Sequence, residues 1–105
     1  MSKLAVIACI TLSEDSAPKY MEAAQAILEP TRAEAGCEFY GIAVDVKDST
    51  RIWVSEQWES QEALHAHLRA PHVEAFLGTV ADLEILDMDA RQYEVAAVGP
   101  VILPE

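Results

Sequence analysis

The chain has 105 residues, 51% of them hydrophobic and 24% charged, which is typical of one packed domain and excludes a disordered chain. Its 18 acidic and 7 basic residues give a formal net charge of −11. A surface of this charge repels phosphate backbones and anionic lipids, so nucleic acids and membranes are disfavoured as partners.

The first third of the sequence predicts a strand followed by a helix. Lys3–Leu12 is an uninterrupted apolar run rich in β-branched residues, which favours a strand covered on both faces. Turn and cap residues follow at 13–16, and apolar side chains then recur at helical spacing over 20–35. Pro30 should bend this helix, and Gly36 should end it.

The remaining sequence predicts two strands, two helices and a last strand. Strands are expected over residues 37–46 and 51–58, separated by a polar turn. Ser60 can cap a short helix, which Pro71 separates from a second one. A long final strand over 84–98 precedes an apolar tail. The helical residues with core spacing are Leu64 and Leu68 in the first helix, and Val73, Phe76, Leu77 and Val80 in the second.

These elements give the order β-α-β-β-α-α-β, which predicts an α+β, ferredoxin-like domain with an antiparallel sheet over residues 1–98 and a tail over 99–105. Right-handed crossovers place the helices on one face of the sheet. The first strand is apolar on both faces, so the second face needs a cover. A second copy of the chain supplies it, and we expect a homodimeric α+β barrel joined through the sheet.

A series of short motifs lies between residues 34 and 76. It comprises the E-x-G-C-like segment 34–37, E-Q-W-E-S at 56–60, A-H-L at 66–68 and P-H-x-x-A-F at 71–76. In order and spacing these motifs resemble the quinol monooxygenases of the antibiotic-biosynthesis-monooxygenase family, over Lys3 to about Tyr93. The resemblance implies a cofactor-independent monooxygenase that oxidises a small quinol- or polyphenol-like aromatic with dioxygen.

The resemblance also implies a pocket between the sheet and the helices. Trp58 of the Q-W-E-S segment and His72 of the P-H segment are its predicted catalytic residues, with Trp58 as the wall facing the aromatic ring. His72 follows Pro71 in the first turn of a helix, where the helix dipole favours a neutral imidazole that can act as a general base. The further residues predicted to bind substrate are Val54, Glu56, His67, Leu68 and Phe76.

Each of these residues also has a purely structural interpretation. Trp58 can be a core side chain, and His72 can make a local hydrogen bond. His65 and His67 lie two apart, at the borders of the apolar stripe of their helix, where histidine usually faces solvent. A zinc site built from His65, His67, His72 and Glu56 is therefore disfavoured, and we expect no metal and no other cofactor.

The sequence departs from two branches of the family. Members that form polyketide quinones carry an asparagine and a tyrosine where this chain has Val54 and Leu64. Haem-degrading members carry an asparagine in the first strand, which aligns with Ala8. Haem degradation is therefore less favoured, whereas a small-molecule isomerase and a non-catalytic ligand binder on the same barrel stay open.

The two cysteines, Cys9 and Cys37, are not spaced for a metal. We expect buried thiols of a cytoplasmic protein, although a disulfide between them stays open.

Overall fold

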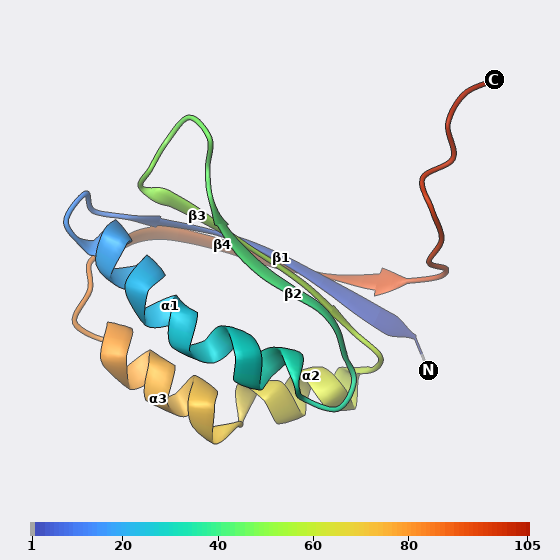
Figure 1. Ribbon diagram of the computed structural model, residues 1–105, viewed down its shortest axis with the longest axis horizontal. Coiled ribbons are helices and arrows are strands. Elements are labelled where there is room, and N and C mark those ends of the chain that lie inside the picture. Colours follow the sequence, from blue (N-terminus) through green and yellow to red (C-terminus); the bar gives the residue numbers. More distant parts are fainter. Residues whose placement is uncertain (1) are drawn as a thin grey trace.

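The computed structural model describes residues 2–105 and contains a four-stranded sheet with three helices on one of its faces (Figure 1). Its elements are β1 (Lys3–Leu12), α1 (Ser16–Arg32), β2 (Cys37–Val44), β3 (Arg51–Trp58), α2 (Gln61–Leu68), α3 (Pro71–Val80) and β4 (Ile85–Val95). The strands lie in the order β2-β3-β1-β4, and all neighbouring pairs are antiparallel. This is the predicted ferredoxin-like fold. No helix in residues 2–105 is both long and apolar enough to cross a membrane.

The core lies between the sheet and the helices. Alternate side chains of β1 and β3 point toward the helices because successive residues of a strand face opposite sides. On α1 and α3, the rings of Tyr20 and Phe76 meet edge to face with their centroids 5.3 Å apart. The largest buried side chains on the sheet are Leu4, Ile10, Leu12, Tyr40, Ile52, Val54 and Trp58.

Two leucines that the helical spacing assigned to the core, Leu68 and Leu77, are more than half exposed. The buried face of α2 consists of Ala63, Leu64 and His67, and that of α3 of Val73, Phe76 and Val80. The buried face of each helix is therefore rotated by a fraction of a turn from the apolar stripe predicted by the sequence. Leu68 and Leu77 consequently lie at the solvent-facing edges of these buried faces.

Three elements are shorter than predicted: α1 ends at Arg32, β2 ends at Val44, and β4 spans Ile85–Val95. β2 stops because the Asp45 carboxylate accepts hydrogen bonds from the backbone N–H groups of Lys47 and Asp48 at 3.0 and 3.1 Å. β4 stops where its partner begins, since Val95 pairs with Lys3 at the start of β1. The tail beyond it extends away from the domain (Figure 1).

The turn between α1 and β2 depends on Gly36, whose φ of +86° lies in the left-handed region. The Glu34 N–H donates to the Thr31 carbonyl at 3.0 Å as the helix ends. The Gly36 carbonyl then accepts the Glu59 N–H at 2.8 Å, which ties the turn to the end of β3. The turn thereby fixes the position of Glu34.

Gly36→Ala should destabilise the fold by about 2–5 kcal/mol. A Cβ at this position would lie 2.6 Å from the Ala63 Cβ and 2.9 Å from the Glu59 Cγ. Overpacking costs about 1–3 kcal/mol, and the left-handed conformation adds about 1–2 kcal/mol. Urea unfolding measures the loss. Gly78→Ala is the matched control, because Gly78 lies in α3 with open space around it and should gain stability. Equal stability of the two variants would contradict this account of the turn.

The face of the sheet opposite the helices is uncovered and exposes several large apolar side chains. Ile7 of β1, Phe39 of β2 and Tyr93 of β4 are 43%, 57% and 46% exposed on it. A hollow of about 290 Å³ on this face is lined by Ile7, Cys9, Arg51, Trp53, Asp87, Asp89, Arg91 and Tyr93. We call this surface the open face.

Both cysteines are free thiols. Cys9 is buried, as predicted, whereas Cys37 is only half-buried because it begins β2 at the edge of the sheet.

Candidate functional site

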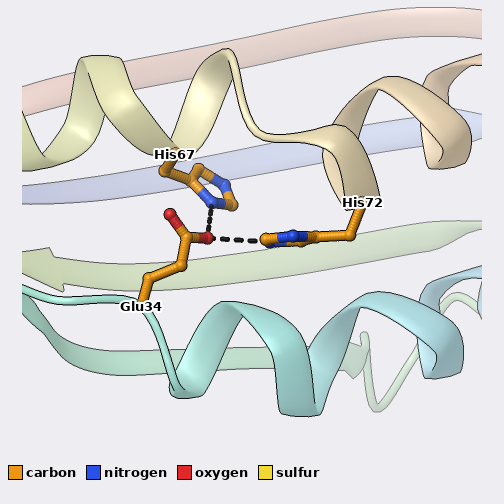
Figure 2. A group of neighbouring side chains, drawn as sticks. All are labelled: Glu34, His67 and His72. Carbon is orange, nitrogen blue, oxygen red and sulfur yellow. Dashed lines mark hydrogen bonds and ion pairs between the residues drawn. The ribbon is translucent and has the colours of Figure 1, made fainter.

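The end of α1 and the junction between α2 and α3 bring one carboxylate and two histidines together (Figure 2). His67 Nδ1 lies 2.7 Å and His72 Nε2 lies 2.8 Å from the same atom, Oε2 of Glu34. These are hydrogen-bond distances, so each imidazole donates an N–H to the carboxylate. We call these three residues the Glu34 cluster.

The local sequence explains why the two histidines meet. The residue before a proline avoids the helical conformation, and Ala70, with ψ of 145°, is extended immediately before Pro71. α2 therefore ends before this point, and α3 begins at Pro71. His67 thus lies in the last turn of α2 and His72 in the first turn of α3, facing each other across the break.

His67 is buried, with 4% exposed, contrary to the expectation that both His65 and His67 face solvent. His65 is exposed. The difference follows from the helical face: His67 lies three residues after Leu64 and four after Ala63, both of which are buried. Its ring packs against Trp58, with the ring centroids 4.7 Å apart.

Trp58 links the Glu34 cluster to a second carboxyl group. Its indole Nε1 donates to Glu56 Oε1 at 2.9 Å. Burial raises the pKa of the Glu56 carboxyl, the hydrogen bond from Trp58 and the charge of His67 oppose the rise, and the charge of Glu34 adds to it. Glu56 is therefore a stronger base than an ordinary surface carboxylate.

A cavity of about 320 Å³ lies between α2 and the part of the sheet formed by β1, β3 and β4. Among the described residues that line it, Glu56 alone carries a carboxyl group. The guanidinium of Arg91, another lining residue, is held by Asp89 through two hydrogen bonds of 3.1 and 3.2 Å. The remaining lining residues are Val6, Ala8, Leu64, Leu68, Ala90 and Gln92. The cavity thus has apolar walls and one group able to accept a proton.

The residues predicted from the sequence fall into three groups in the structure. Glu56 and Leu68 line the cavity. His67 and His72 contact Glu34. Trp58, Val54 and Phe76 are buried in the core, and Trp58 is connected to the cavity through its hydrogen bond to Glu56.

Sequence reasoning did not select Glu34 or the cavity wall on β4. Glu34 was noted only as part of the segment 34–37, because nothing in the linear pattern joins the end of α1 to histidines more than 30 residues away. The available signals were the glycine two residues later, which ends a helix at a fixed turn, and the spacing of His67 to Ala63 and Leu64.

A ferredoxin-like sheet with an apolar cavity beneath its helices defines a scaffold for small-molecule sites. Residues 4–78 match the model of the family described as antibiotic biosynthesis monooxygenase, and the chain belongs to this family.

Solved structures share the fold over nearly the whole chain. The Pseudomonas aeruginosa protein PA3566 has a TM-score of 0.82 and 30% identity, over 92% of this chain and 97% of that one. A protein of Deinococcus radiodurans described as a putative antibiotic biosynthesis monooxygenase has a TM-score of 0.83 and 22% identity, over 94% and 98%. One of Nitrosomonas europaea, described in the same words, has a TM-score of 0.83 and 21% identity, over 90% and 91%. A comparison with curated protein sequences gave no match.

Proposed function

We propose that the protein is a monooxygenase that oxidises a small quinol- or polyphenol-like aromatic with dioxygen and uses no metal or organic cofactor for this reaction. The observation that carries the proposal is the apolar cavity whose one carboxyl group, Glu56, has a raised pKa. Membership of the antibiotic biosynthesis monooxygenase family supports the class of chemistry. The cavity volume lies near the lower end of the ~300–1,000 Å³ found for small-molecule sites, which suits a ligand of one or two rings.

In this reaction the substrate itself is the reductant. A phenolic hydroxyl has a pKa near ~10, and its deprotonated form gives up an electron far more readily. A base within hydrogen-bond reach therefore promotes electron transfer to dioxygen. One oxygen atom is added to the ring and the other leaves as water. One quinol and one dioxygen molecule thus give one hydroxylated quinone and one water, with four electrons supplied by the quinol.

We assign the base to Glu56, because it lines the cavity. His72, which the sequence suggested for this role, donates to Glu34 and is the second candidate. Trp58 orients the Glu56 carboxyl through the 2.9 Å hydrogen bond.

The residues that distinguish this chain from other branches of the family support an apolar substrate. Ala8 and Leu64 line the cavity at the positions that align with polar residues in haem-degrading and quinone-forming members. The cavity is therefore adapted to a ring with few polar substituents beyond those that reach Glu56.

Oxygen uptake by the purified protein with menadiol, in buffer containing a chelator, tests the proposal. We expect one dioxygen consumed per menadiol, a hydroxylated quinone as product, and no hydrogen peroxide above the rate of the protein-free control. Formation of unmodified quinone and peroxide would indicate an oxidase. Binding of the quinol without oxygen uptake would leave the isomerase and the non-catalytic binder as the alternatives.

We also propose a homodimer joined through the open face, because Ile7, Phe39 and Tyr93 expose apolar area there. The two sheets would then form the barrel predicted from the sequence. The two free thiols are consistent with the cytoplasmic location that we propose for the protein.

Ile7→Lys should convert the dimer to a monomer, because it places an unpaired charge in the middle of the buried interface. Light scattering at micromolar concentration should give about twice 11.5 kDa for the wild type and about half that mass for the variant. Val46→Lys is the matched control, since Val46 is 98% exposed in the turn after β2. A monomeric wild type, or a dimeric Ile7→Lys, would refute the interface.

A further inference from the structure

The Glu34 cluster has the composition of a metal site. Its three donor atoms lie within 4.8 Å of one another and come from α2, α3 and the turn after α1 (Figure 2). Two imidazoles and one carboxylate are ligands suited to zinc and other divalent transition metals. We propose that the cluster binds one divalent transition-metal ion, of the Zn²⁺ class, through Glu34, His67 and His72.

The distances fit an ion that replaces the two hydrogen-bonded protons. His67 Nδ1 and His72 Nε2 lie 2.7 and 2.8 Å from Glu34 Oε2. Zinc bonds of about 2.0–2.2 Å at tetrahedral angles separate the donor atoms by about 3.3–3.5 Å. Each histidine nitrogen therefore moves about half an ångström away from Glu34 Oε2, which rotation of the partly exposed Glu34 and His72 side chains supplies.

The ligands are held in place by their surroundings. The His67 ring packs against both Trp58 and Tyr40, at centroid distances of 4.7 and 5.5 Å. Glu34 follows the end of α1 and precedes the fixed turn at Gly36. The His67 side chain is only 5% exposed, whereas those of Glu34 and His72 are 14% and 22% exposed. Three ligands are thus oriented before an ion binds. Water can complete the coordination from the solvent, where Glu34 and His72 are partly exposed.

The charge around the cluster favours a cation. Glu34 is hydrogen-bonded to the two histidines, and no lysine or arginine in residues 2–105 is paired with it. Glu56, the second carboxyl, lies behind Trp58. A bound dication would neutralise this partly buried negative charge, which explains why two histidines converge on one carboxylate.

The site is independent of the proposed oxidation, because none of its three ligands lines the cavity. The Trp58 side chain connects the two sites, since His67 packs on its ring and its indole N–H donates to Glu56.

Calorimetric titration of the chelator-treated protein with Zn²⁺ tests the proposal, and Co²⁺ reports the geometry by its visible spectrum. We expect one ion per chain with micromolar or tighter affinity, and intense tetrahedral Co²⁺ bands. Glu34→Gln and His72→Gln should weaken binding beyond the about 10–100-fold that loss of an outer-sphere partner costs. Both variants alter partly exposed residues, and circular dichroism in metal-free buffer confirms that they fold.

His65→Gln is the matched control, since His65 is an exposed histidine of the same helix whose ring contacts Gln61. It should bind Zn²⁺ with wild-type affinity. Absence of binding at millimolar Zn²⁺, unchanged binding in Glu34→Gln, or an equal loss in His65→Gln would each overturn the proposed site.

Discussion

Glu56→Gln should lower the rate of quinol oxidation by about 10²–10⁴-fold, the usual cost of losing a general base. Glutamine keeps the shape of the side chain, and its carbonyl oxygen can still accept the hydrogen bond from Trp58 Nε1. Burial raises the pKa of the Glu56 carboxyl, so in the wild type kcat/KM should rise with pH through a value above that of an ordinary glutamate. This rise of kcat/KM with pH should be absent in Glu56→Gln. Both profiles are measured by oxygen uptake in buffer containing a chelator.

The stability of the same variant separates a catalytic role from a structural one. A carboxyl group whose pKa is raised by folding costs stability when it is ionised, and this cost appears as the pH rises from the unfolded to the folded pKa. Glu56→Gln should therefore be at least as stable as the wild type at neutral pH, and this advantage should disappear in acid. A variant that is both less stable and less active would indicate that Glu56 supports the fold instead.

His72→Ala distinguishes the two candidate bases. If Glu56 takes the proton, His72→Ala should retain most of the oxygen uptake. The His72 ring is hydrogen-bonded to Glu34 and does not line the cavity. A loss of about 10²–10⁴-fold in His72→Ala, with Glu56→Gln active, would return the role to the histidine.

Trp58→Ala should destabilise the protein by about 3–5 kcal/mol, since the side chain is completely buried in the core. The cavity left behind would also free two neighbours: the His67 ring loses its packing partner, and Glu56 loses its hydrogen-bond donor. Urea unfolding followed by the fluorescence of the remaining Trp53 measures the loss. An effect below about 1 kcal/mol would show that the core readily collapses around this position.

Trp58→Phe is the companion variant, because it retains a ring against His67 and removes the indole N–H. Its stability should lie between those of the wild type and Trp58→Ala. The indole N–H lowers the pKa of Glu56, so the pH limb of kcat/KM should move upward in Trp58→Phe.

The fold could be predicted from the sequence because its signals are local. The alternation in residues 51–58 fixed both the bounds of β3 and the helix-facing side of Val54 and Trp58. The ends of α1 and β2 were less predictable, since a few hydrogen bonds decide where the chain turns, such as the two that the Asp45 carboxylate accepts after β2.

The candidate site was less predictable because it is assembled by tertiary contacts. The sequence indicated His67, His72 and Glu56 separately, but Glu34 joins the two histidines only because the turn at Gly36 directs it toward the α2–α3 break. The cavity wall on β4 depends in the same way on the register between Ala8 and Ala90, which no linear pattern specifies.

β4 is an edge strand of the sheet. Within residues 2–105 it pairs only with β1, so one row of its backbone N–H and C=O groups faces outward. Such an edge can recruit strands from other molecules and seed fibrils. β4 carries Asp87, Asp89, Arg91 and Glu94 among its 11 residues, and charged side chains on an edge strand disfavour pairing with further strands. Edge-to-edge pairing of β4 between copies of the chain is thereby disfavoured. Concentrated solutions should therefore stay free of filaments, although the open face exposes apolar side chains.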